Sequence, residues 1–120
     1  DINSIWVNEM KAGDYNPIHI HQGKIHTGVS SVMILKLPKD FGPEPARPDH
    51  PLNGQLQILG SASGQFVRSD YVPRMKIGDF FVFPYDMRHA VYPFTNKKAK
   101  RITLVCNCDV DYDAVASRSI

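Results

Sequence analysis

Short runs of β-forming residues, separated by glycine, proline, asparagine and aspartate, constrain the fold of this chain most strongly. Helical periodicity is scarce. The runs that predict strands are residues 4–11, 16–21, 28–37, 55–60, 65–71, 79–83, 89–93 and 100–108. Eight short strands suit two facing antiparallel sheets, so we expect an all-β jelly roll with little helix.

Length and charge limit the class of protein. The 120 residues fit one domain over 1–120, and 42% hydrophobic residues suffice for a single core. The formal net charge is +2, and the one basic cluster, at residues 97–101, indicates a hairpin turn more than a nucleic-acid patch. No apolar run is long enough to span a membrane. We therefore expect neither nucleic acid nor membrane as a partner, while the oligomeric state and any residues upstream of Asp1 stay open.

The two cysteines, Cys106 and Cys108, flank a single residue on an expected strand. A disulfide across one residue is geometrically strained, so both are expected to be reduced thiols. Reduced thiols are typical of the cytoplasm, which is the location we expect.

The long segment of residues 39–53 carries four prolines and is unsuited to a helix or an inner strand. Two interpretations stand side by side: a lid or binding loop, and a surface insertion. With Arg68, Tyr71 and Arg74, this loop is a candidate to line a substrate groove.

Three histidines form the candidate metal site. His19 and His21 lie two apart on an expected strand, so both side chains point to the same face. His89 follows a hydrophobic strand and a proline turn. Three protein ligands leave coordination positions open, which is where metal chemistry takes place.

Other residues compete for this role. His21 has the alternative of a hydrogen-bonding position outside the metal, His26 is a rival ligand, and His50 lies in the proline-rich loop, where we expect exposure. The candidate carboxylates are Asp14, Asp79 and Asp86, of which the last two are expected to shape turns. Imidazole suits zinc, copper, nickel and iron alike, so ligand type alone does not select the metal.

Arg101 opens the last expected strand, where alternation places it with Thr103 and Val105 on one face. If that face lines the interior, the guanidinium is buried and requires a carboxylate partner, which it would bind through two hydrogen bonds. If it faces outward, Arg101 is an exposed residue leading out of the turn. The spacing leaves both possibilities open.

At this point the motifs resemble a known family. They are Gly13-x5-His19-x-His21, Gly78-Asp79-Phe80-Phe81-Val82-Phe83-Pro84, His89-Ala90-Val91-Tyr92-Pro93 and Arg101-Ile102-Thr103. Together they resemble the 2-oxoglutarate/Fe(II)-dependent oxygenases, most closely the prolyl-4-hydroxylase-like members with short forms in bacteriophages. The resemblance runs from Trp6 to about Asp113.

The resemblance implies a double-stranded β-helix fold and a dioxygenase, or hydroxylase, that uses Fe(II), 2-oxoglutarate and dioxygen. It implies His19, His21 and His89 as catalytic metal ligands. Arg101 would pair with the distal carboxylate of 2-oxoglutarate, and Thr103 would add a hydroxyl beside it. The substrate would be a peptide, prolyl residues included, or a small molecule, acted on in the cytoplasm, or the host cytoplasm for a phage protein.

The chain departs from the family at one ligand position. The usual motif is His-x-Asp/Glu, but the second ligand position here reads His21. A cupin is the main rival, because the first and second motifs also match cupin patterns in part. The cupin glutamate near residues 24–26 is missing, and Pro93 replaces the cupin asparagine. A non-catalytic jelly-roll binding module is the third interpretation.

Overall fold

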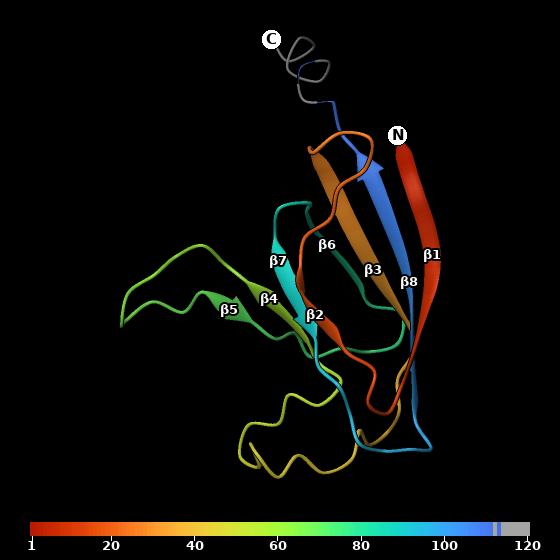
Figure 1. Ribbon diagram of the computed structural model, residues 1–120, viewed down its shortest axis with the longest axis vertical. Coiled ribbons are helices and arrows are strands. Elements are labelled where there is room, and N and C mark those ends of the chain that lie inside the picture. The colour runs from red at the N-terminus through yellow and green to blue at the C-terminus, as the bar shows by residue number, and fades with distance from the viewer. Residues whose placement is uncertain (112, 114–120) are drawn as a thin grey trace.

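A computed structural model of the chain describes residues 1–111 and 113 (Figure 1). Its elements are the strands β1 (Ile2–Lys11), β2 (Asn16–His19), β3 (Gly28–Lys36), β4 (Leu56–Leu59), β5 (Asp70–Tyr71), β6 (Phe80–Pro84), β7 (Arg88–Val91) and β8 (Lys100–Asp109). Seven of the eight expected strands are confirmed to within two residues at either end, and the eighth, expected over 65–71, forms only at Asp70–Tyr71. Among the described residues, no helix is long and apolar enough to cross a membrane.

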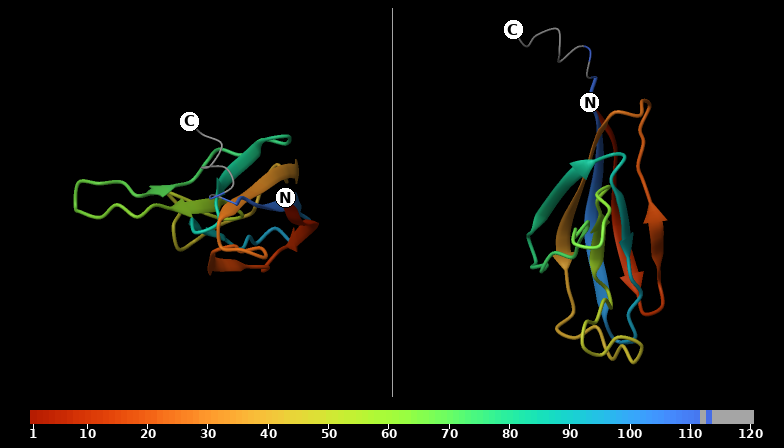
Figure 2. Two further views of the ribbon diagram at one scale, coloured as in Figure 1. Left: turned by 90° about the horizontal axis from the view of Figure 1, so that it is seen from above. Right: turned by 90° about the vertical axis from the view of Figure 1, so that its left-hand side faces the viewer.

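The strands form two four-stranded antiparallel sheets that face each other (Figure 2). One sheet has the order β1-β8-β3-β6 and the other β2-β7-β4-β5. Consecutive strands alternate between the sheets for most of the chain, which is the winding of a jelly roll, or double-stranded β-helix. Between β1 and β2, Gly13 has a φ of 87° at the turn where the chain leaves one sheet for the other, a conformation that favours glycine.

The expected strand over 65–71 is the least accurate prediction. Only Asp70–Tyr71 pair with β4, and residues 61–68 continue as an exposed arm that projects from the body (Figure 1). A two-stranded hairpin with no face to bury gains little from ladder bonds. The regular pairing therefore ends close to the body of the domain.

Strand β8 lies in the middle of its sheet, between β1 and β3. Its alternation is complete: Arg101, Thr103, Val105 and Asn107 are buried, and the intervening residues are partly exposed. This decides between the two positions left open for Arg101, because the guanidinium faces the interior. Cys106 and Cys108 lie on the opposite face of the strand and are both free thiols, as expected.

Two apolar clusters fill the space between the sheets and leave room for a polar site. The first contains Met10, Leu56, Val91, Phe94 and Ala99. The second contains Val32, Ile34, Phe83 and Val105. Alternate residues of the strands supply these side chains, as the period of a half-buried strand requires. The site therefore rests on a packed scaffold.

The proline-rich segment of residues 39–53 is held by its own hydrogen bonds. Glu44 accepts hydrogen bonds from the backbone amides of Leu52 and Asn53, and Asn53 Nδ2 donates to the carbonyl of Gly42 at 2.8 Å. The segment lies at the lower end of Figure 1. These contacts describe an ordered surface loop.

Candidate metal centre

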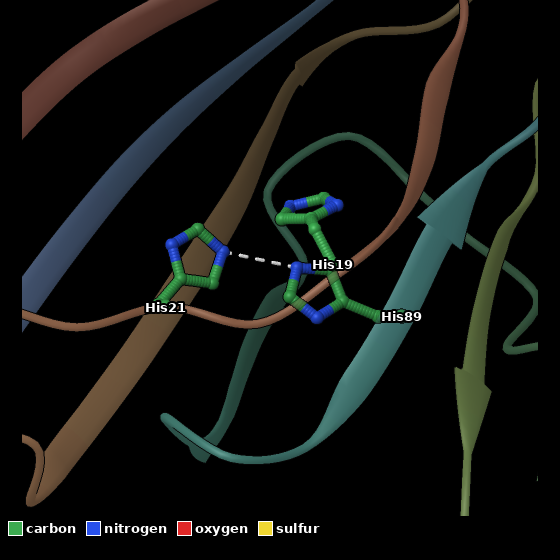
Figure 3. Close-up of side chains that lie close together, drawn as sticks. All are labelled: His19, His21 and His89. Atoms are coloured by element: carbon green, nitrogen blue, oxygen red, sulfur yellow. Dashed lines mark hydrogen bonds between the residues drawn. The ribbon is translucent and has the colours of Figure 1, made fainter.

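The three histidines come together between the sheets (Figure 3). His19 on β2 and His89 on β7 are direct partners across the antiparallel pair. Opposed residues of this kind have Cβ atoms about 4.5–5.5 Å apart, so two imidazoles there reach a common point. Counting one ring nitrogen from each histidine, the potential ligand atoms all lie within 4.8 Å of one another.

His21 joins this pair from just beyond β2. The strand ends at His19, two residues earlier than expected, but the backbone amide of His21 donates a hydrogen bond to the carbonyl of Tyr85 at 2.9 Å and ties this residue to the turn before β7. Its ring stacks on that of His89, with centroids 4.8 Å apart. The two Nε2 atoms lie 3.0 Å apart.

Backbone carbonyls fix the orientation of two of the rings. His19 Nδ1 lies 2.6 Å from the carbonyl oxygen of Pro17, and His89 Nδ1 lies 2.9 Å from that of Met87. A carbonyl only accepts hydrogen bonds, so in the neutral rings Nδ1 carries the proton and Nε2 keeps its lone pair. This is the arrangement by which outer hydrogen bonds prepare histidines to bind a metal.

The environment of the cluster favours neutral imidazoles. Burial lowers the pKa of His21 to about 4, with smaller contributions from the charges of His89 and His19. Burial also lowers the pKa of His89, although the hydrogen bond to Met87 opposes this effect. At neutral pH these two rings are therefore unprotonated bases, the form in which histidine binds metals.

A cavity of about 300 Å³ opens beside the histidines. It is lined by Trp6, Asn8, Asn16, His19, His21, Val32, Leu56, His89, Val91, Arg101, Thr103 and Val105. A volume of this size lies at the low end of pockets for small molecules. Both sheets contribute to the lining, with the histidines on one side and the polar face of β8 on the other.

Arg101 lines the cavity as a buried charged residue. Its side chain is 1% exposed. Its guanidinium contacts Met75 Sδ at 3.4 Å and Met10 Sδ at 3.9 Å, and its Nε atom has no partner. Within residues 1–111 no carboxylate forms an ion pair with it, and burial lowers its pKa to about 10. Since a buried charge without a partner is costly, an anion that entered the cavity and paired with Arg101 would relieve this cost.

Other residues considered from the sequence lie elsewhere. His26 and His50 are exposed and outside the histidine cluster. Asp14 and Asp79 each accept a hydrogen bond from the backbone amide three residues before them, at 2.8 Å, so they stabilise turns. The residues lining the cavity include neither the proline-rich loop nor Arg68, Tyr71 or Arg74.

Several polar side chains at the site escaped the sequence analysis. Asn8 and Asn16 line the cavity, and Asn107 is buried against His21. The signal for Asn107 was present, because the alternation that groups Arg101, Thr103 and Val105 places it next on the same face. The sequence did not identify these asparagines as site residues because an amide is not a typical ligand for transition metals.

The residues present fit a divalent metal that accepts imidazole. The potential ligand atoms of the three histidines lie within 4.8 Å of one another, and the rings of His19 and His89 are held by backbone carbonyls. Iron(II) is one of the metals that such nitrogen donors suit. The set differs from a two-histidine, one-carboxylate site because all three donors are neutral, so the metal charge would be balanced only by an incoming anion.

Comparison with known proteins assigns the family. The model of the family described as "Putative 2OG-Fe(II) oxygenase" matches residues 4–107, most of the chain. The chain belongs to this family. It is also similar to the crystal structure of an RmlC-like cupin protein from Desulfovibrio desulfuricans, at 21% identity and a TM-score of 0.46, over 87% of this chain and 69% of that one. Comparison with curated protein sequences finds no match.

Proposed function

We propose that this member of the 2OG-Fe(II) oxygenase family is an active dioxygenase that uses Fe(II) and 2-oxoglutarate. The observation that carries the proposal is the buried, unpaired guanidinium of Arg101 in the cavity that also contains the three histidines. A dicarboxylate such as 2-oxoglutarate has one carboxylate for the guanidinium and a keto acid for the metal. One molecule would thereby satisfy both halves of the site.

Each residue has a distinct role in this proposal. His19, His21 and His89 hold Fe(II), which supplies the oxidative chemistry when bound. Arg101 forms two parallel hydrogen bonds to the distal carboxylate, a geometry that its planar fork favours. Thr103, two residues along the same face and 1% exposed, offers a hydroxyl to that carboxylate. The apolar wall provided by Val32, Leu56 and Val91 excludes water from this end of the cavity.

The substrate is a peptide or a small molecule in this proposal. Its most specific form is that the protein hydroxylates prolyl residues, as a phage-type short prolyl-4-hydroxylase-like enzyme would. The cavity of about 300 Å³ leaves little volume beyond the cosubstrate. The target group would therefore enter from the open side of the cavity. This favours a single side chain or a small ring over a large rigid ligand.

The test is the conversion of 2-oxoglutarate to succinate. Purified protein is incubated with Fe(II), ascorbate and 2-oxoglutarate in air, and succinate is quantified against protein without iron. We expect iron-dependent formation of succinate above the level of the iron-free control. Calorimetric titration of 2-oxoglutarate into oxygen-free, metal-loaded protein provides the binding measurement. Absence of binding at millimolar 2-oxoglutarate would refute the proposal.

The all-imidazole donor set favours a second candidate, a cupin-type metal site that works without 2-oxoglutarate. In this version a neutral three-histidine site binds the metal and Arg101 binds the acid group of another ligand. The two candidates differ in one measurement. A cupin-type protein would bind metal but would produce no succinate, and a non-catalytic module would bind ligand without turning over.

A further inference from the structure

Asn107 lies directly behind the candidate metal centre and is not used by the proposed mechanism. It is 5% exposed and belongs to the inward face of β8. Its Nδ2 lies 3.3 Å from Nδ1 of His21, and its Oδ1 is buried without a hydrogen-bond partner. A buried amide oxygen without a partner is costly and calls for an explanation.

The orientation of the Asn107 amide is linked to the ring nitrogen of His21 that carries the proton. If Asn107 Nδ2 donates to Nδ1 of His21, the ring proton must be on Nε2. Nε2 then donates to Nε2 of His89 at 3.0 Å, which is free to accept because Nδ1 of His89 faces the carbonyl of Met87. The network is self-consistent, but it places a proton on the very atom of His21 that a metal would require.

A half-turn of the Asn107 amide removes this conflict. The turn exchanges Oδ1 and Nδ2, so Oδ1 can accept a hydrogen bond from Nδ1–H of His21. The ring keeps one proton throughout, now on Nδ1, and the Nε2 lone pair becomes available. His21 then has the same tautomer as His19 and His89, with an outer acceptor behind each ring.

The neighbouring strand offers a partner for the displaced NH2 group. Ser30 on β3 is the direct cross-strand partner of Asn107, so the two side chains lie on the same face. Its hydroxyl is buried and has no hydrogen-bond partner. After the turn Nδ2 faces away from His21 and occupies the place of Oδ1, which forms no hydrogen bond with the Ser30 hydroxyl in the structure. A rotation of the Ser30 side chain would therefore be required to bring its oxygen within hydrogen-bond distance of Nδ2.

We propose that Asn107 is a positioning residue that sets the tautomer of His21, donating to the ring in the metal-free site and accepting from it when a metal binds. The inference rests on the proposed metal site and adds to it how His21 acquires the tautomer that leaves its Nε2 free to bind the metal. The amide provides the outer acceptor that this extra histidine requires.

The experiment uses Zn(II), a diamagnetic probe of the same imidazole donors, on protein labelled with 15N at histidine. Long-range 1H–15N correlation spectra report the tautomer of each ring. We expect His21 to change from the Nε2–H to the Nδ1–H form on zinc binding, while His19 and His89 keep Nδ1–H. An Nε2–H tautomer of His21 in the zinc complex, or an Nδ1–H tautomer before zinc is added, would overturn the inference.

Variants separate a positioning role from a structural one. Asn107→Asp can only accept and should fix the Nδ1–H tautomer without metal, with zinc affinity at least equal to that of the wild type. Asn107→Leu removes the hydrogen bond and should weaken zinc binding by about 10- to 100-fold, the usual effect of losing such an outer partner. Asn53→Leu is the matched control, a buried asparagine of the proline-rich loop that does not line the cavity, and should bind zinc normally.

The outcomes distinguish this inference from the proposed function. If the wild type binds no zinc, the metal site itself is refuted and the inference falls with it. If zinc shifts the resonances of all three histidines but Asn107→Leu binds as tightly as the wild type, the metal site stands and the role of Asn107 is refuted. Should the leucine variant fail to fold, the tautomers of the wild type and of Asn107→Asp still decide.

Discussion

Replacing Arg101 with methionine is expected to stabilise the ligand-free protein while abolishing its binding of 2-oxoglutarate. The guanidinium is buried against the sulfur atoms of Met10 and Met75, which are weak hydrogen-bond acceptors. Methionine preserves the unbranched shape in this apolar setting and carries no charge to desolvate. The variant is therefore expected to be more stable than the wild type but unable to bind 2-oxoglutarate.

The size of the effect follows from the pKa of Arg101. Burial lowers it from 12.5 to about 10, and at about 1.36 kcal/mol per unit this penalises the charged form by roughly 3 kcal/mol. The shorter methionine leaves a small void, which costs about 1 kcal/mol of stability and reduces the gain. We expect a net gain of about 1–3 kcal/mol, in line with apolar replacements of buried charges. For a chain of this length this raises the unfolding midpoint by roughly 4–12 °C.

Thermal unfolding followed by circular dichroism provides the measurement, with and without 2-oxoglutarate on the metal-loaded, oxygen-free protein. At a ligand concentration of 100 times Kd, the wild type should gain about 2.7 kcal/mol, whereas the methionine variant should gain nothing. Arg101→Lys is the matched control, because it keeps the charge and loses the two-pronged geometry. A correctly folded methionine variant less stable than the wild type would refute the reasoning, since the guanidinium would then be net stabilising without an anion.

Three further predictions concern the histidines. His89→Ala should abolish Co(II) binding in an absorption titration, because only two ligands would remain, and the control His26→Ala should bind Co(II) normally. Unchanged Co(II) affinity in His89→Ala would show that the metal site lies elsewhere. His21→Asp should tighten Fe(II) binding and raise succinate formation, because a carboxylate neutralises part of the metal charge, and a variant less active than the wild type would contradict this. Acid should destabilise the metal-free protein: His21 has a folded pKa of about 4 against 6.5 unfolded, so the unfolded state binds the extra proton and unfolding free energy falls as pH drops from 6.5 to 4. Allowing for partial exposure, the loss is roughly 1–2 kcal/mol in urea titrations, and His21→Gln should remove it.

The strands were predictable because a half-buried sheet imposes a period of two, and seven of the eight expected strands agree with the structure to within two residues at either end. The prediction that His19 and His21 lie at the same site followed from the same period, and the structure brings both together with His89. Alternation alone left the orientation of β8 open, since a buried arginine breaks the rule that charged residues face water. Only the family resemblance favoured the inward position of Arg101 that the structure shows. Asn107 was missed because its importance depends on a contact with His21, 86 residues away in the chain.

The opposed placement of the site residues has a mechanical consequence. His19 and His89 belong to the sheet of β2 and β7, whereas Arg101 belongs to the sheet of β1 and β8. A small dicarboxylate held at one end by the metal and at the other by the guanidinium would act as a clasp across the interior of the domain. Without the dicarboxylate the two sheets would separate more easily in local opening motions. Amide hydrogen exchange in both β7 and β8 should therefore be slower in the ligand-bound state than in the free protein.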